Sequence, residues 1–232
     1  MTPDIPYKRK AVDPVECIKA GWEMIKPYYW LFVGMAFIAY VIGQAVPVIL
    51  MGPMLCGFYL SLFMVRRREP IEFGTLFKGF DYFGPSVVAT LLHALPVVVI
   101  IIPAYLLFYA SFVIAIMAQG NSQSPAAAFG VFLTFSLVMI VISVVILIIS
   151  VGFAFSYPLI VDRRLNGLDA VKLSFKAGMA NFWRLLGMML LTGLITVAGV
   201  ACCIVGMYLV LPISYGAIAA AYEQVFGLKD PR

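Results

Sequence analysis

Long uncharged runs constrain this chain more than any other feature. No Asp, Glu, Lys or Arg occurs from Pro27 to Val65, from Tyr82 to Val161 or from Leu185 to Tyr222. Each run is longer than the roughly 20 apolar residues that one helical crossing of a bilayer needs. The whole chain of 232 residues is 63% hydrophobic and 12% charged, whereas soluble domains are about 45–50% apolar and 25% charged. We therefore expect an all-α, polytopic membrane protein.

The lengths of the first and last runs predict two helical hairpins. A helix rises about 1.5 Å per residue, so a run of roughly 39 residues reaches about 58 Å, or two crossings of a hydrocarbon core about 30 Å thick. The turns are expected near residues 43–47 and 201–203, which are short and uncharged.

The middle run is about twice as long and has one polar, turn-rich interruption, QGNSQSPAA, at residues 119–127. This pattern predicts two long helices, at about 84–118 and 127–161, with Pro96 and Pro103 as kink sites in the first. The chain then has six spans in three hairpins. Eight spans, with each long helix folded into a short hairpin, is the alternative.

The cations predict the orientation. All 16 Lys and Arg residues fall on one side of the six-span arrangement, and the three opposite loops carry none. Because such residues stay in the cytoplasm, we expect a multi-pass protein of the bacterial cytoplasmic (inner) membrane with both termini cytoplasmic. Residues 1–12 form a polar tail without the order of a signal peptide. The net charge of +5 indicates attraction to anionic lipid rather than nucleic acid.

Amphipathic segments precede the hairpins. Residues 168–182 and residues 14–26 each place large apolar side chains three and four apart on one helical face, and residues 70–83 do so more weakly. Asp13 is the expected N-cap of the first helix and Pro14 its first residue. We expect three amphipathic helices on the inner leaflet. Their apolar stripes are Val15, Ile18, Trp22 and Ile25; Phe73, Phe77 and Phe80; and Leu168, Val171, Phe175, Met179 and Phe182.

Shared spacing predicts a threefold repeat of one amphipathic helix and one hairpin. Pro53 and Gly57 in the second span match Pro212 and Gly216 in the last, and each proline follows a lysine of the preceding amphipathic helix by 34 or 36 residues. The middle copy, from Lys78 to Pro158, is expanded to 80. Chance similarity in apolar sequence is the alternative. The expected parts are the tail 1–12 and the repeats 13–69, 70–166 (expanded) and 167–232.

The residues offer little equipment for catalysis. The chain has one histidine and lacks the HExxH, GxxxxGK[ST], GxGxxG and GxSxG motifs. The predicted spans contain no carboxylate or cation of the kind that marks proton relays and ion pathways. We expect no enzyme, no metal site and no cofactor.

A few residues inside or beside the spans have specific expectations. His93 is a candidate intramembrane polar site, and a neutral imidazole hydrogen-bonded to a neighbouring helix is the plainer interpretation. Cys56, Cys202 and Cys203 are read as packing residues, whereas Cys17 is expected to face the cytoplasm. Small residues four apart predict close helix approach. These pairs are Gly52 with Cys56 and Ala217 with Ala221.

The cations next to the spans are the candidate site, because clustered Lys and Arg attract lipid phosphates by about 1 kcal/mol each. An ordinary positive-inside stop signal is the alternative interpretation of the three consecutive arginines at 66–68. The candidate headgroup-binding residues are Lys19, Arg66, Arg67, Arg68, Lys78, Arg163, Arg164, Lys172, Lys176 and Arg184.

The last third of the chain carries a resemblance. The segment VDRRLNGLDAVKLSFKAGMANFWRLLGMMLL, followed by LPISYGAIAAAYEQVFG, spans Val161 to Gly227. It resembles the C-terminal half of a group of bacterial six-span inner-membrane proteins, which are similar in style to the membrane domain of some glycerophosphoryl diester phosphodiesterases. The resemblance implies an inner-membrane location and no established catalytic residues. No phosphodiesterase domain is present here, so that activity is not implied.

Three functional classes follow. The first is a non-enzymatic membrane protein that organises lipids with anionic headgroups or a partner protein, including a second copy of itself. The second is a transporter or channel for a lipid-like or apolar solute, since repeated hairpins can enclose a cavity. The third, an intramembrane lipid enzyme, lacks a catalytic constellation. A ligand-sized cavity between the spans would favour the second class, and a tightly packed bundle the first.

Overall fold

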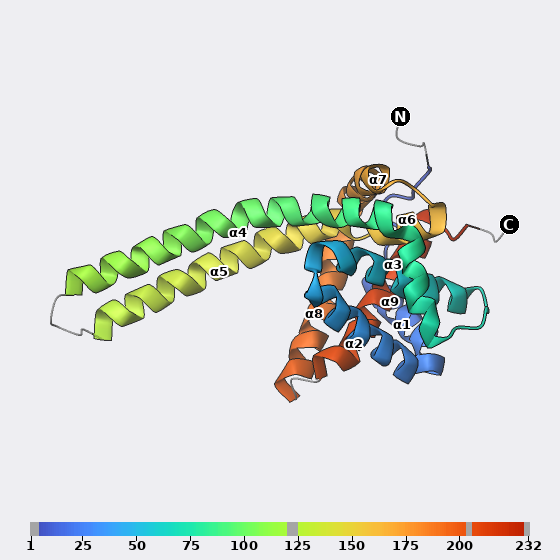
Figure 1. Ribbon diagram of the computed structural model, residues 1–232, viewed down its shortest axis with the longest axis horizontal. Helices are drawn as coiled ribbons and strands as arrows, with labels where there is room; N and C mark the ends of the chain where they lie inside the picture. The colour runs from blue at the N-terminus through green and yellow to red at the C-terminus, as the bar shows by residue number, and fades with distance from the viewer. Residues whose placement is uncertain (1–4, 120–124, 203–205, 230–232) are drawn as a thin grey trace. The chain divides into compact units, whose positions relative to one another are not determined.

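In a computed structural model, residues 5–119, 125–202 and 206–229 are described, and within these ranges the chain is helical without strands (Figure 1). The helices are α1 (Pro14–Ile25), η1 (Lys26–Tyr28), α2 (Tyr29–Ala45), α3 (Pro47–Arg66), η2 (Phe73–Tyr82), α4 (Phe83–Gln119), α5 (Pro125–Phe153), α6 (Ser156–Arg163), α7 (Gly167–Ala180), α8 (Phe182–Cys202) and α9 (Gly206–Phe226).

In the described residues, six helical segments are long and apolar enough to cross a membrane, which agrees with the six predicted spans and indicates a multi-pass membrane protein. The predicted interruption at 119–127 and the predicted turn at 201–203 lie partly outside the described residues. The six segments are Pro14–Ala45, Val48–Arg66, Phe73–Val113, Phe129–Arg163, Phe182–Ala201 and Gly206–Phe226.

The chain divides into two compact units. Unit 1 comprises Met1–Leu92 and Val151–Arg232, and unit 2 comprises His93–Ser150. Unit 2 lies wholly within the middle repeat predicted at 70–166.

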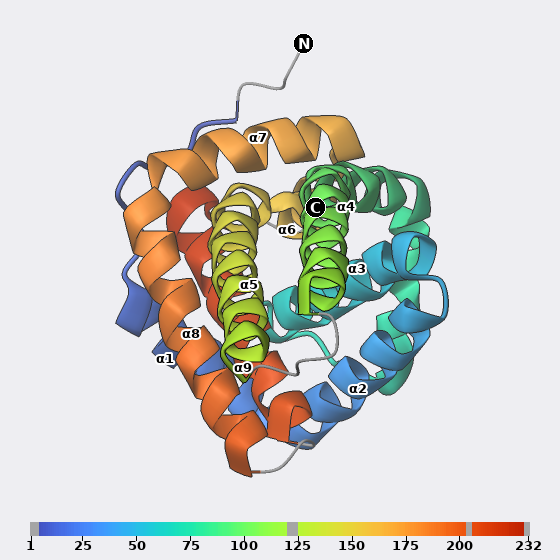
Figure 2. The same cartoon turned by 90° about the vertical axis from the view of Figure 1, so that its left-hand side faces the viewer.

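Unit 1 is built around α3 and α9. Helix α2 packs against α3, α8 packs against α9, and α2 also contacts α9. Figure 2 shows α7 running across the end of α8 rather than continuing it. Aromatic side chains fill the interior: Phe32 and Phe58 meet with ring centroids 5.5 Å apart, and Phe63 meets Tyr222 at the same distance. The core therefore joins residues from both ends of the chain.

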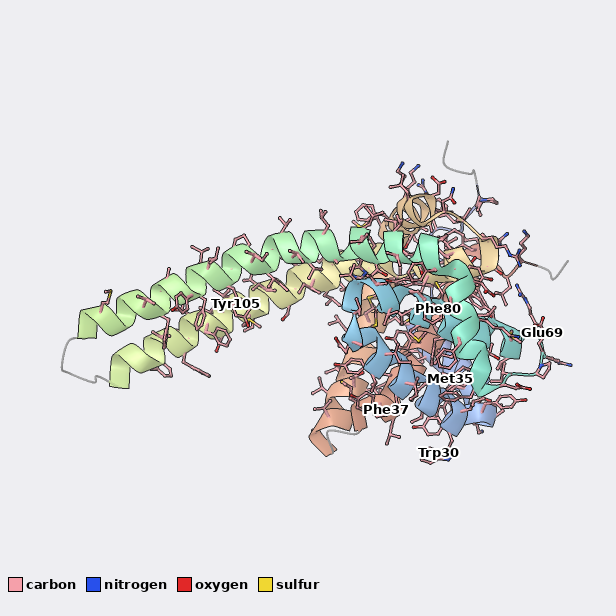
Figure 3. All side chains as sticks on the ribbon, in the orientation of Figure 1. Trp30, Met35, Phe37, Glu69, Phe80 and Tyr105 are labelled. Atoms are coloured by element: carbon pink, nitrogen blue, oxygen red, sulfur yellow. The ribbon has the colours of Figure 1, made fainter. Side chains whose placement is uncertain are left out.

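The surface of unit 1 separates apolar from polar side chains. Met35 is fully buried, whereas Trp30 is 75% exposed and is directed away from the helices (Figure 3). Nitrogen and oxygen atoms gather near α7 and near the loop that carries Glu69, while the far ends of α2 and α8 carry mainly carbon (Figure 3). This separation is what a protein partly immersed in lipid requires.

Unit 2 consists of the distal parts of α4 and α5, whose large apolar side chains are mostly exposed. The rings of Phe108 and Phe135 pack with centroids 4.6 Å apart, and the neighbouring cavity holds only about 10 Å³. The hydroxyls of Thr134 and Ser136 donate to carbonyls one turn earlier. Both polar groups are thus satisfied within their own helix, as an apolar solvent demands.

The helix predicted at 127–161 is not continuous. Helix α5 ends at Phe153 and α6 begins at Ser156, and a side chain from α7 hydrogen-bonds two backbone groups at this break. Ser174 Oγ accepts a hydrogen bond from Phe155 N at 3.0 Å and donates one to Gly152 O at 2.8 Å. Helix α4 begins at Phe83, one residue before the predicted start, so Gly84 and Pro85 lie in its first turn, where proline is tolerated.

Candidate functional site

The three helices predicted to be amphipathic, α1, η2 and α7, bury small residues together with Met24, Leu76 and Leu173. Each buries a glycine against the protein: Gly21, Gly79 and Gly178. Most residues of the predicted apolar stripes are exposed. The exposed members are Val15, Trp22, Phe73, Phe77, Phe80, Leu168, Phe175 and Met179. The stripes are therefore largely exposed, although Ile18 and Val171 pack partly buried against the core and the ring of Phe175 lies against Gly152 of α5.

Two residues of the predicted stripes lie elsewhere. Ile25 is fully buried, because it packs beside Gly216 of α9, where an added Cβ would lie 2.6 Å from Ile25 Cδ1. Phe182 is the first residue of α8 rather than part of α7, since the helix is interrupted at Asn181.

Glycine allows each of these helices to pack with its backbone directly against the backbone of another helix. A Cβ on Gly21 would lie 2.5 Å from the carbonyl carbon of Gly216, and one on Gly178 would lie 2.5 Å from Val151 O. A Cβ on Gly79 would overlap Pro53 O and Gly57 N even more closely. Real Cβ atoms essentially never approach other atoms this closely. No larger residue fits at these three positions without moving a helix.

The lysines of the amphipathic helices are exposed. Lys19 on α1, Lys78 on η2, and Lys172 and Lys176 on α7 all point away from the core. Within the described residues, none of them forms an ion pair with a carboxylate. Their ammonium groups are thus open to ligands beside the exposed apolar stripes.

Three of the predicted headgroup-binding arginines have partners inside the protein. Arg67 Nη2 lies 2.9 Å from Asp162 Oδ1, and Arg163 Nε lies 3.1 Å from Asp162 Oδ2. Arg66 Nε lies 2.9 Å from Glu223 Oε2. Binding of lipid headgroups by these arginines stays a prediction.

Asp162 is the centre of this network, and its side chain is fully buried. Its Oδ2 accepts a hydrogen bond from Tyr222 OH at 2.8 Å, and its carboxylate also accepts from Lys229 N. Arg67 and Arg163 donate in addition to backbone carbonyls of residues 226–229. The network fixes the chain after α9 to the ends of α3 and α6. Asp162 was not among the predicted site residues, although a carboxylate that ends an apolar run beside two arginines is a usable signal.

Two of the remaining candidate arginines share an unusual backbone. Arg68 and Arg164 have φ of 58° and 53°, and Lys10 has φ of 53°. In the described part of the chain, these three are the non-glycine residues with positive φ. This left-handed conformation costs a non-glycine residue about 1–2 kcal/mol. Each of the three precedes an amphipathic helix by a few residues.

Arg184 lies in the first turn of α8, where its Nη1 donates to Val12 O at 3.2 Å. Asn181, at the α7–α8 junction, accepts from Ala11 N and donates to Lys8 O. The segment before α1 is therefore held against the corner between α7 and α8.

Cys17 does not face the cytoplasm as predicted. It is fully buried, because it lies on the same small-residue face of α1 as Gly21, and its Sγ is 3.2 Å from Oε1 of Gln224 on α9. Cys56 is also fully buried. His93 lies in α4 at the start of unit 2 and is half-buried, so its role stays a prediction.

The described residues hold no cluster of three or more His, Cys, Asp or Glu that could bind a metal ion. Comparison with protein families, with curated proteins and with solved structures finds no match to this chain, so the resemblance of its last third stays a prediction.

Proposed function

We propose that this chain is a non-enzymatic integral membrane protein that organises anionic lipids at the cytoplasmic face of the bacterial inner membrane. One observation carries the proposal: the amphipathic helices expose their large apolar side chains and their lysines together. Phe175 and Met179 lie beside exposed Lys176, and Phe77 lies beside exposed Lys78. In a soluble protein such stripes would be buried against the core.

Lipid satisfies both halves of this surface. The apolar side chains can enter the headgroup and acyl boundary, while the lysine stems lie along it and the ammonium groups meet phosphates. Each cation near an anionic surface contributes about 1 kcal/mol. Three such helices would gather several anionic lipids around the protein.

The packing of α2 and α3 against α9 favours an organising role over transport. The cavity between α2, α3 and α9, lined by Ala39, Phe58 and Tyr215 among others, holds about 10 Å³. A single water needs roughly 10–15 Å³, so this space is too small for a lipid or other solute.

The order of the glycine contacts supports the threefold repeat. Helix α1 rests on Gly216 of α9, η2 rests on Gly57 of α3, and α7 rests on Val151 near the end of α5. Helices η2 and α7 thus pack on the second span of the preceding repeat. Helix α1 of the first repeat packs on the second span of the third repeat. Gly57 and Gly216 are the glycines that matched by sequence spacing.

The proposal predicts the effect of reversing the exposed charge. Changing Lys19, Lys78 and Lys176 together to Glu should leave the protein inserted, because the spans are unchanged, but should reduce co-purified anionic lipid by roughly tenfold or more. Native mass spectrometry of the protein extracted in mild detergent measures the bound lipid.

Two matched variants complete this test. Changing Lys19, Lys78 and Lys176 to Arg keeps the positive charges and should retain the lipid. Changing Lys8, Arg9 and Lys229 to Glu lowers the net charge by the same amount outside the amphipathic helices and should also retain the lipid. Unchanged lipid in the Lys19, Lys78 and Lys176 variant would rule out the proposal. Loss of a co-purifying protein with lipid retained would assign the surface to a partner.

The proposed topology predicts that single cysteines at positions 69 and 165 react only from the cytoplasm, whereas one at position 122 reacts from outside. A background without native cysteines and a membrane-impermeant maleimide, applied to intact and then to opened cells, gives the measurement. Labelling of position 122 only after opening would contradict six spans.

A further inference from the structure

The corner between α7 and α8 encloses an open cavity of about 210 Å³, lined by Lys10 and by residues 179–184. This is about twenty times the volume of the cavity between α2, α3 and α9. Drug-sized ligands occupy about 300–1,000 Å³, so the cavity suits a smaller group.

The charge of the lining is uniformly positive. Lys10 and Arg184 line the cavity, and no acidic residue does. In the described part of the chain neither cation is paired with a carboxylate, whereas Arg66, Arg67 and Arg163 all are. Arg184 gives one donor to Val12 O, and a guanidinium has five N–H donors in all. Two cations that face one small cavity without a counter-ion fit a compact anion.

The backbone at Lys10 strengthens this assignment. A left-handed residue is usually Gly, because Gly takes positive φ without cost. The chain uses Gly in this way directly after α9, where Gly227 has φ of 68°. At position 10 this conformation falls on a lysine that lines the cavity, and backbone strain of this kind clusters at binding sites.

A second corner repeats the arrangement. The cavity where η2 meets α4 measures about 410 Å³ and is lined by Arg164, another left-handed cation, together with Asp81, Tyr82, Pro85 and Leu165. Here a carboxylate accompanies the guanidinium, so this cavity is less suited to an anion. Of these two cavities, the one at the α7–α8 corner has only cations among its charged lining residues.

The setting points to the origin of the anion. Trp183 lines the cavity and is 79% exposed, and Met179 is 45% exposed. Trp is enriched at the level of lipid headgroups, and phosphate is the anion that headgroups present there. We propose that Lys10 and Arg184 bind a phosphate group in this cavity, carried by a lipid headgroup or free in solution. The inference rests on the proposed function only in that a lipid would supply the phosphate.

Lys10→Gly and Arg184→Gln test the site. Lys10→Gly removes the ammonium group but suits the left-handed backbone, so the fold should be retained. Arg9→Gln removes one charge from the adjacent, exposed residue that does not line the cavity, and it is the matched control. The full-length protein in detergent is titrated by calorimetry with dioctanoyl phosphatidic acid and separately with inorganic phosphate.

The affinity for dioctanoyl phosphatidic acid should fall roughly tenfold or more in both cavity variants, as expected for a lost hydrogen bond to a charged group, and should be unchanged in Arg9→Gln. Inorganic phosphate that binds as tightly as the lipid, with the same dependence on the variants, would support the site and assign it to free phosphate. Equal affinity in all variants, or a loss in only one cavity variant, would overturn the two-cation site.

This outcome is separable from that of the proposed function. The lysines 19, 78 and 176 do not line the cavity, so their triple Glu variant should retain the affinity of the cavity for dioctanoyl phosphatidic acid. Retention of bulk lipid by that variant would refute the proposed function and leave the phosphate site standing. Loss of affinity for dioctanoyl phosphatidic acid only in Lys10→Gly and Arg184→Gln would assign its binding to this cavity.

Discussion

Gly79→Ala should destabilise the protein by about 3 kcal/mol or more, the upper end of the cost of overpacking. The added methyl group would overlap backbone atoms of Pro53 and Gly57, which cannot rotate away as a side chain can. Helix η2 must then separate from α3, against which it is closely packed. At about 2–4 °C per kcal/mol for a chain of this size, the melting temperature should fall by roughly 10 °C, measured by circular dichroism in mild detergent.

Gly74→Ala is the matched control, because it makes the same change in the same helix. No atom lies within 4 Å of a Cβ added at Gly74, so the melting temperature should change by no more than about 2 °C. Equal melting temperatures for Gly79→Ala and Gly74→Ala would contradict the close packing of η2 on α3. Gly21→Ala should resemble Gly79→Ala, because it meets the backbone of Gly216 and Ala217.

Features of the fold that depend on local composition could be predicted from the sequence. Uncharged runs identified the six apolar helices, because a bilayer admits few charges and requires a minimum helix length. Small-residue spacing identified close helix approach: a Cβ on Gly52 would lie 2.7 Å from Ser86 O, and Cys56, Ala217 and Ala221 are fully buried. Asp13 caps α1 as expected, accepting hydrogen bonds from Val15 N and Glu16 N.

Features that depend on distant partners could not be predicted in this way. At the break between α5 and α6, Phe155 N donates to the hydroxyl of Ser174, which lies 19 residues further along the chain. The burial of Cys17 requires α9, which lies near the other end of the chain. Hydropathy and helical periodicity report only on neighbours along the chain, so neither contact leaves a local signal.

In the candidate site too, the exposure of the lysines could be predicted from the sequence, whereas the partners of the arginines could not. Exposure of Lys19, Lys78 and Lys176 beside the apolar stripes agrees with their helical periodicity. The partners of the arginines do not follow from sequence, because Arg67 pairs with a carboxylate 95 residues away and Arg66 with one 157 residues away. Positive-inside counting treats all cations alike and cannot separate paired arginines from unpaired lysines.

Asp162→Asn should destabilise the protein by about 3–5 kcal/mol, the usual cost of removing one partner from a buried ion pair. The carboxylate is fully buried and serves two arginines and Tyr222. The amide of Asn keeps the size of the side chain but removes its charge. Its NH₂ group would face the donors of the two arginines and Tyr222, with which it cannot form a hydrogen bond as an acceptor. Thermal unfolding in detergent provides the measurement.

A second measurement distinguishes this network from general loss of stability. Asp162 accepts from Lys229 N, and Arg67 donates to Lys229 O, so the variant should release the chain after α9 below its melting temperature. Limited trypsin digestion should then cleave at Lys229 several times faster in Asp162→Asn. Glu223→Gln serves as the control, because the Glu223 side chain is 16% exposed and that of its partner Arg66 is 52% exposed, whereas Asp162 is fully buried, so Glu223→Gln should lose less stability. If Glu223→Gln and Asp162→Asn lose equal stability, the buried carboxylate does not organise the ends of α3, α6 and α9.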